Sequence, residues 1–312
     1  MRVVVTGGAG FIGANLCAQF STHRQTTEVI ALDDLSTGFA SNLGDVDAKL
    51  VVGSILDRDV LADTVDTADA VVHLAARPSV PRSLADPVAG HAATATGTLY
   101  VLEAARAAGA HVVVASSSSV YGATKELPKH ELLPTRPLSP YAVSKLATEA
   151  YTLAYATSFD LRTLAFRFFN VYGPLQPAGH AYAAVVPAFI DAALHDAPLT
   201  VYGDGRQTRD FTYVGTVTRV ITDAVVRGVT APQPVQRRLR HADRPARPDR
   251  AARDDPGQGV AGTERGAAPR RCPRLAGGAG VAAVAVPGRA AGAARRRARN
   301  HGRVVQGVSA TC

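Results

Sequence analysis

Two side chains that could share a proton stand one helical turn apart in this sequence. Tyr141 and Lys145 begin and end the run Tyr-Ala-Val-Ser-Lys, inside a helical pattern that continues to about residue 158. On a helix this spacing puts both side chains on one face, where the ammonium of Lys145 can stabilise the phenolate of Tyr141 and lower its pKa. A tyrosine tuned in this way can act as a general base. The spacing is also common on solvated helix faces, so its weight depends on other motifs.

A glycine pattern near the start of the chain predicts a dinucleotide site. The apolar residues 3–5 are typical of a buried parallel strand, and they lead directly into Gly7, Gly10 and Gly13. The missing side chains allow a tight turn, close approach of a pyrophosphate and packing of the next helix on the strand. A second strand pattern ends in Asp33, placed to bind the hydroxyls of an adenosine ribose, which favours NAD over NADP. The alternative for Asp33 is an acidic loop residue without a ligand.

Strand and helix patterns alternate along the chain up to the Tyr141 helix. The predicted strands cover residues 28–33, 49–53, 70–74 and 112–115, and the predicted helices 57–64 and 97–108. This alternation predicts an α/β fold with a doubly wound parallel sheet of the Rossmann type. Ligands of such sheets bind beyond the carboxyl ends of the strands, so we expect Ala75, Ala76 and residues 116–119 to line the crevice.

Composition argues against several other classes of protein. No uncharged apolar run reaches the roughly 18 residues that a membrane helix needs, and the first residues lack the layout of a signal peptide. We therefore expect no membrane partner and a cytoplasmic location. Cys17, Cys272 and Cys312 have neither the number nor the spacing for a disulfide framework or a zinc site, so no metal is expected.

The composition changes after about residue 235. Residues 236–312 hold 17 Arg, 5 acidic residues and only two Leu, whereas the whole chain has a formal net charge of +8, so residues 1–235 are net negative. Such a tail offers little apolar surface to offset chain entropy. We expect a Rossmann domain at 1–169, a smaller, incomplete substrate lobe at 170–235 and an irregular, disordered tail at 236–312. A non-catalytic dinucleotide-binding protein with a basic nucleic-acid arm is one alternative, although nucleic acid is not the favoured partner.

Six short motifs follow one another in the first three quarters of the chain. They are Thr-Gly-Gly-Ala-Gly-Phe-Ile-Gly at 6–13, His-Leu-Ala-Ala at 73–76, Ser-Ser-Ser-Ser-Val-Tyr-Gly at 116–122, Tyr-Ala-Val-Ser-Lys at 141–145, Arg-Phe-Phe-Asn-Val-Tyr-Gly-Pro at 167–174 and Gly-Asp-Gly-Arg-Gln-Thr-Arg-Asp-Phe at 203–211. Together they resemble the extended short-chain dehydrogenase/reductase family, and within it the NAD-dependent nucleotide-sugar epimerase branch.

The resemblance implies a role for each matching residue. Tyr141 would be the base, Lys145 its partner and a ligand of the nicotinamide ribose, and Ser117 the hydroxyl that bridges substrate and tyrosine. Asn170 and Arg209 would contact the sugar nucleotide, Arg209 through the diphosphate. The alternative for Arg209 is a surface ion pair with a neighbouring aspartate. The implied NAD-binding set is Gly7, Gly10, Phe11, Ile12, Gly13, Asp33, Leu74, Ala75, Ala76, Tyr141 and Lys145.

The residues after Ser117 narrow the implied activity. Dehydratase relatives have an Asp-Glu pair at the positions of Ser118 and Ser119, so elimination of water loses its acid and base here. The resemblance then implies 4-epimerisation of a nucleotide-diphosphate sugar, most of all a UDP-sugar, with proton transfer by Tyr141 and hydride transfer by NAD. A nucleotide-sugar decarboxylase is the alternative within the family. The resemblance also implies a homodimer.

Three residues depart from the family pattern within the matching part. Ser54, Thr94 and Thr216 stand where the family commonly has Asp, Asn and Asp. The first two predict looser NAD binding than in a typical member. Thr216 is expected to cap a helix that starts near Val217.

The tail lacks the strand, helices and diphosphate-binding arginine with which the family ends. When it is read from the second base of each codon, residues 236–250 become compatible with a strand, a cap and an apolar helix, and residues 268–277 and 303–305 with later family segments. We infer a shifted reading frame and expect the chain as given to be inactive or weakly active. The encoding DNA tests this inference, because codons incompatible with the decoded peptide contradict it.

Overall fold

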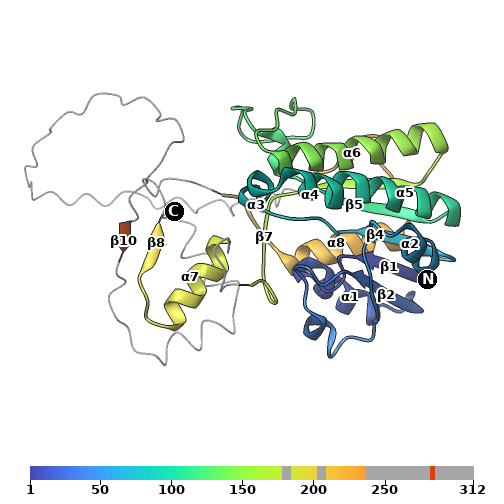
Figure 1. Cartoon of the computed structure of the whole chain (residues 1–312), viewed down its shortest axis with the longest axis horizontal. Helices are drawn as coiled ribbons and strands as arrows, with labels where there is room; N and C mark the ends of the chain where they lie inside the picture. Colours follow the sequence, from blue (N-terminus) through green and yellow to red (C-terminus); the bar gives the residue numbers. More distant parts are fainter. Residues whose placement is uncertain (178–183, 202–208, 237–281, 285–312) are drawn as a thin grey trace, which may run out of the picture.

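Six strands form one parallel sheet in the order β3-β2-β1-β4-β5-β6 (Figure 1). The computed structural model describes residues 1–177, 184–201, 209–236 and 282–284. The strands are β1 (Arg2–Thr6), β2 (Glu28–Asp33), β3 (Lys49–Val52), β4 (Ala70–His73), β5 (His111–Ser117) and β6 (Thr163–Phe168). This strand order is that of the Rossmann fold, so the predicted doubly wound sheet is confirmed.

The central strands β1 and β4 are buried on both faces, which agrees with their continuous rather than alternating apolar residues. Val3 and Val5 of β1 belong to one core cluster, and Val4 between them belongs to the other. The register pairs Val3 with Val29 of β2 and with Ala70 of β4, so β1 lies at the centre of the sheet. The glycine turn that follows β1 is thereby placed at the middle of the carboxyl edge.

Helices cover the two faces of the sheet, as Figure 1 shows for α1 and α8 on one side and α5 and α6 on the other. The helices are α1 (Phe11–Ser21), α2 (Arg58–Val65), α5 (Gly97–Ala108), α6 (Pro140–Phe159) and α8 (Val214–Val226). Phe20 of α1 and Ile221 of α8 share the core cluster of Val3, whereas Leu61 of α2, Leu102 of α5 and Tyr155 of α6 share that of Val4. No helix within the described part of the chain is long and apolar enough to cross a membrane.

A chain of short helical segments connects β4 to α5. These are α3 (Val80–Ala85), α4 (Pro87–His91) and the π-helical turn η2 (Ala92–Thr96), while 3-10 turns occur at η1 (Ala40–Leu43) and η3 (Ser118–Tyr121). The side chains of Ser79 and Asp86 cap α3 and α4 by accepting hydrogen bonds from Arg82 N and Ala89 N.

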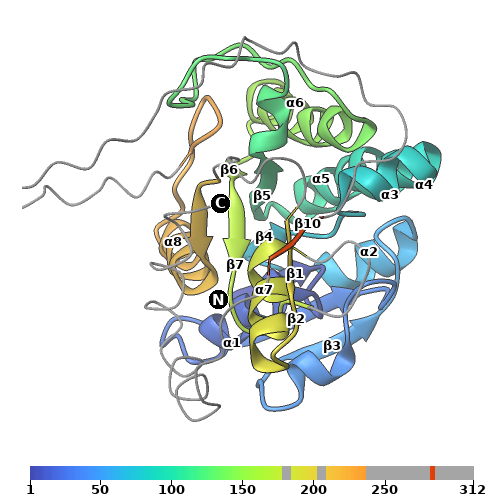
Figure 2. The ribbon, with the colours of Figure 1, turned by 90° about the vertical axis from the view of Figure 1, so that its left-hand side faces the viewer.

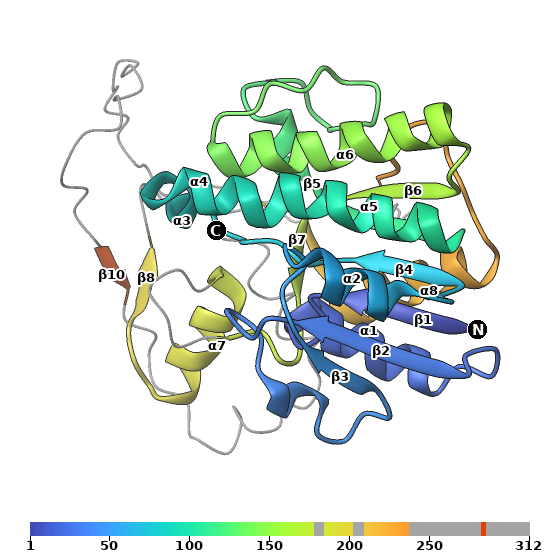
Figure 3. The ribbon, with the colours of Figure 1, turned by 45° about the vertical axis from the view of Figure 1, so that its right-hand side comes forward.

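Smaller elements lie beyond the carboxyl edge of the sheet, where Figures 2 and 3 show α7 and β8. They are β7 (Asn170–Tyr172), α7 (Val185–Leu194), β8 (Leu199–Val201), β9 (Phe211–Tyr213) and, in the tail, β10 (Ala282–Val284). Strands β7 and β9 pair in parallel, and β8 and β10 pair antiparallel. No strand was predicted in the tail, so β10 departs from the expected irregular structure. The other predictions for the tail, apart from Gln236, concern residues that the structure does not describe.

The segment after α8 returns to the main sheet. Val235 N donates to Ala165 O (2.8 Å) and Arg167 N donates to Val235 O (2.9 Å), which adds a one-residue parallel bridge beside β6. The expected cap at Thr216 is wrong, because α8 begins at Val214 without a side-chain cap and contains Thr216. The predicted division at residues 169 and 235 stays a prediction.

Candidate active site

The turn between β1 and α1 requires glycine for steric reasons. Gly7 has a φ of 71°, and a Cβ added to it would lie 2.8 Å from Ala75 N; a Cβ on Gly13 would lie 2.0 Å from Gly7 O. Gly10 precedes α1 and offers no side-chain cap, so the first N–H groups of the helix, including those of Phe11 and Ile12, have no capping side chain. Such a helix start is suited to a phosphate.

Asp33 ends β2 beside this turn and is only 7% exposed. Its Oδ2 accepts a hydrogen bond from Ala9 N (3.0 Å) and its Oδ1 accepts one from Leu35 N (2.8 Å). Burial raises the pKa of Asp33, and these backbone bonds oppose the shift. Gly38 packs so closely that an added Cβ would lie 3.0 Å from Asp33 Oδ1. The carboxylate is therefore held in place with lone pairs left to accept from ribose hydroxyls.

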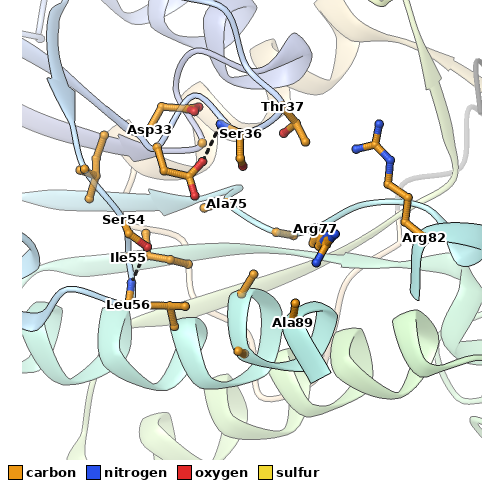
Figure 4. Close-up of a pocket in the computed structure, with 17 residues that line it drawn as sticks. Asp33, Ser36, Thr37, Ser54, Ile55, Leu56, Ala75, Arg77, Arg82 and Ala89 are labelled. Atoms are coloured by element: carbon orange, nitrogen blue, oxygen red, sulfur yellow. Dashed lines mark hydrogen bonds between the residues drawn. The ribbon is translucent and has the colours of Figure 1, made fainter. Parts of the chain in front are cut away.

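A cavity of about 560 Å³ opens against Asp33 at the carboxyl edge of the sheet (Figure 4). Its lining is Gly7, Leu32, Asp33, Asp34, Ser36, Thr37, Gly53, Ser54, Ile55, Leu56, Ala75, Ala76, Arg77, Arg82, Ala89, Ala92 and Ala93. Four predicted NAD residues line it, namely Gly7, Asp33, Ala75 and Ala76. Most of the lining residues that sequence reasoning missed follow the ends of β2, β3 and β4, and that position was the available signal, whereas Ala89, Ala92 and Ala93 come from α4 and η2.

The shape and chemistry of this cavity fit a dinucleotide. Glycine leaves room at the turn for phosphates, Asp33 offers a carboxylate that could accept from ribose hydroxyls, and Ala75 and Ala76 add only small side chains to the lining. The remaining members of the predicted NAD set do not line the cavity. Gly10, Phe11, Ile12 and Gly13 build the turn and the helix start, and Leu74 packs against the core cluster of Val3.

The predicted catalytic residues meet where β5 ends and α6 begins. Ser139 caps α6 by accepting from Ala142 N (3.2 Å), and Pro140 opens the first turn, which places Tyr141 and Lys145 on the face toward β5. Lys145 Nζ donates to Ala115 O (2.7 Å), two residues before Ser117. The side chain of Ser117 lies close enough to Tyr141 to act on its pKa through hydrogen bonding. The fold therefore brings the three residues together.

Burial dominates the titration of this group. It lowers the pKa of Lys145 from 10.5 to about 8, because the ammonium loses solvation. It also raises the pKa of Tyr141, and the bond with Ser117 only opposes this shift. The net direction for Tyr141 is therefore opposite to the lowering expected from Lys145.

Asn170 lies on the second parallel pair, and Arg209 lies two residues before its other strand. Asn170 begins β7, where its Nδ2 and its main-chain N both donate to Asp210 O (3.1 and 3.2 Å). The register pairs Asn170 with Phe211 of β9, which puts Arg209 two residues from that pairing. Both side chains are exposed, and neither lines the cavity at Asp33.

A Rossmann sheet, a glycine turn and a cavity against Asp33 define a dinucleotide-binding protein. The model of the NAD dependent epimerase/dehydratase family matches residues 3–234. The chain belongs to this family, the resemblance inferred from the motifs is confirmed, and its cofactor is NAD.

Among known relatives, the UDP-glucose 4-epimerase of Mycolicibacterium smegmatis is 39% identical over 234 residues, which cover 73% of this chain and 72% of the relative. The solved UDP-N-acetylglucosamine 4-epimerase of Methanobrevibacter ruminantium is similar with a TM-score of 0.72 at 33% identity, covering 76% of each chain. The Thermus thermophilus UDP-glucose 4-epimerase, solved with NAD, has a TM-score of 0.65 at 36% identity, covering 72% of this chain and 74% of that one.

Relatives with other names also match. A dTDP-glucose 4,6-dehydratase of M. smegmatis is 34% identical, covering 72% of this chain and 70% of the relative. A UDP-N-acetyl-alpha-D-glucosaminuronate decarboxylase of Bacillus cytotoxicus is also 34% identical, covering 68% and 67%. The family therefore comprises NAD-dependent enzymes that modify nucleotide sugars by more than one reaction.

Proposed function

We propose that this chain has the active site of an NAD-dependent nucleotide-sugar 4-epimerase. The observation that supports the proposal is that Tyr141, Ser117 and Lys145 come together where β5 ends and α6 begins, at the same carboxyl edge of the sheet as the cavity at Asp33. The positions after Ser117 hold Ser118 and Ser119, so no carboxyl pair is available there for elimination. NAD supplies reversible removal and return of hydride at the sugar C4.

Each catalytic residue has a proton-handling role in this proposal. Ser117 Oγ accepts from Ser119 N (3.2 Å), which leaves its own proton free to donate to the Tyr141 oxygen or to the substrate. Tyr141 takes the proton of the sugar 4-hydroxyl and later gives it back. The ammonium of Lys145, which donates to Ala115 O, stabilises the phenolate of Tyr141. This protonated form of Lys145 predominates below the pKa of Lys145, which is about 8.

The proposed substrate is a nucleotide-diphosphate sugar, with a UDP-sugar favoured because relatives named for UDP-sugars match over 70% or more of this chain. Asn170 and Arg209 are the proposed contacts with the sugar nucleotide. The proposal includes a cytoplasmic location and a homodimer. Exposed apolar side chains on α3, α4 and α6, namely Leu84, Val88 and Val143, favour burial against a second copy.

The test is turnover of UDP-glucose and UDP-glucuronate, followed by nuclear magnetic resonance with NAD present. The proposal expects UDP-galactose from UDP-glucose in a frame-restored chain, with weak or absent turnover in the chain as given. Tyr141→Phe should lower kcat by about 10²-fold or more, because the general base is lost. Tyr151→Phe, the same change at an exposed tyrosine of α6, is the control and should leave kcat unchanged.

The outcomes separate the alternatives. Release of CO₂ from UDP-glucuronate, with a pentose nucleotide as product, would favour the decarboxylase. Clear activity of the chain as given would contradict the predicted impairment. A salt-dependent gel shift abolished by deletion of residues 237–312 would favour the nucleic-acid arm.

A further inference from the structure

Cationic side chains that the family motifs did not indicate line the cavity at Asp33. Arg77 follows Ala75 and Ala76 at the end of β4, and Arg82 lies on α3. Figure 4 shows both arginines across the cavity from Asp33. A dinucleotide brings a doubly charged diphosphate into a cavity that already contains two carboxylates, Asp33 and Asp34. Helix N–H groups supply only partial charge, so a full positive charge is useful there.

Arg77 is held at two points. Its main-chain N donates to Thr94 Oγ1 (3.3 Å), and its Nη1 donates to Asp86 Oδ2 (2.9 Å). Asp86 is itself oriented because its Oδ1 caps α4 at Ala89 N (3.1 Å). Thr94, the departure from the family asparagine, thus anchors the residue that carries the guanidinium. These contacts restrict the guanidinium to the cavity wall formed by α4 and η2.

The same segment touches the glycine turn. A Cβ on Gly7 would lie 2.8 Å from Ala75 N and 2.9 Å from Ala75 Cα, so the turn and the start of this segment are in direct contact two residues before Arg77. The Arg77 side chain is 38% exposed, and its bond to Asp86 uses one of its five N–H donors. The remaining donors are available to phosphate oxygens, for which a guanidinium is well matched.

We propose that Arg77, positioned by Thr94 and Asp86, is a ligand of the NAD diphosphate in this protein. The inference rests on the NAD cavity of the proposed function but not on the identity of the sugar or the reaction. Arg77 compensates for the looser binding expected from the replacements at Ser54 and Thr94. It does so by adding a positive charge beside the diphosphate.

Calorimetric titration of the full chain with NAD, ADP and adenosine tests this assignment. Arg77→Met should weaken NAD and ADP by about tenfold, the magnitude of a charge-assisted hydrogen bond, and leave adenosine unchanged. The salt dependence of ADP binding should become shallower, since one charge contact is lost. The NAD and ADP affinities of Arg77→Lys should lie between those of the unaltered chain and Arg77→Met, because lysine keeps the charge without the planar guanidinium.

The matched control is Arg227→Met, which removes the same charge from an exposed pair with Asp223 at the end of α8. It should leave all three affinities unchanged, and the Tm without ligand should be the same for both variants. Unchanged NAD and ADP affinities in Arg77→Met would overturn the inference. Equal weakening of adenosine would do so too, because it would mean a change of cavity shape. Absence of NAD binding by the unaltered chain would overturn both this inference and the cofactor site, whereas absence of epimerisation alone would count only against the proposed function.

Discussion

Glu149 and Arg167 form a two-point ion pair in the interior of the protein. Arg167 Nη2 lies 2.6 Å from Glu149 Oε1, and Arg167 Nε lies 2.8 Å from Glu149 Oε2. Each side chain is only 5% exposed. Ser116 donates to the same carboxylate (3.0 Å), and Tyr121 OH accepts from Arg167 (3.0 Å). The pair thus joins α6, which carries the proposed base, to the ends of β5 and β6.

Removal of one partner should be costly. Arg167→Met should lower the free energy of unfolding by about 3–5 kcal/mol, because Glu149 then remains buried without a counter-charge. The double variant Glu149→Leu, Arg167→Met should lose less than the single one. Urea denaturation measures both, with Arg227→Met as the exposed control, expected to cost at most about 1 kcal/mol. A double variant as unstable as the single one would refute the charge argument.

The charge of Lys145 should oppose folding at neutral pH. Its pKa is lowered from 10.5 to about 8, so between these values the unfolded chain binds more protons and stability rises with pH. Lys145→Met should therefore stabilise the ligand-free chain at about pH 7 by about 1–2 kcal/mol, since the lost bond to Ala115 O offsets part of the gain. The gain should disappear before the pH reaches 10.5, where only the cost of the lost bond remains. Thermal unfolding of both proteins across this pH range measures the difference. A Lys145→Met variant that is less stable than the unaltered chain at neutral pH would contradict the prediction.

His73 should make the fold sensitive to acid. Its ring lies between Thr6 Oγ1 (2.7 Å) and Thr98 Oγ1 (3.0 Å), and burial, followed by the charge of Lys145, lowers its pKa from 6.5 to about 3. The contribution of neutral His73 to stability is fully present above pH 6.5 and is lost as the pH falls from 6.5 toward 3, because the unfolded chain then binds the proton more readily. His73→Asn should reduce the acid-dependent loss of stability by about 1.4 kcal/mol per pH unit in this window. Denaturation at about pH 7 and about pH 5 measures it. The exposed His195→Gln serves as control, and an equal acid slope in both variants would contradict the assignment.

Asp33 should set the choice between NAD and NADP. A carboxylate at the ribose position accepts bonds from two hydroxyls and repels a 2′-phosphate. Asp33→Ser should weaken NAD by about tenfold and strengthen NADP, so that the preference narrows or reverses. Calorimetry with both cofactors measures the two affinities, with the exposed Asp45→Asn as a charge control. A preference for NAD that survives unchanged in Asp33→Ser would show that another group discriminates.

Much of the fold was predictable because its signals are local. Residues 28–33 and 97–108 appear in the structure with the predicted bounds, since an apolar run of that length suits a buried strand and a helical period suits one face of a helix. The start of α8 was predicted near Val217 with a cap at Thr216, whereas the helix begins at Val214 after Tyr213, which offers no side-chain cap that a sequence pattern could indicate.

The sequence by itself determined the order of strands and helices, the glycine turn and the carboxylate at Asp33, because these follow from backbone sterics and from patterns a few residues long. Only the tertiary structure decided that Arg77 faces Asp33 across one cavity and that Glu149 meets Arg167. The same holds for the upward pKa shift of Tyr141 and the downward shift of Lys145. These properties depend on burial and on contacts between distant segments. No local pattern specifies how far a side chain is removed from water.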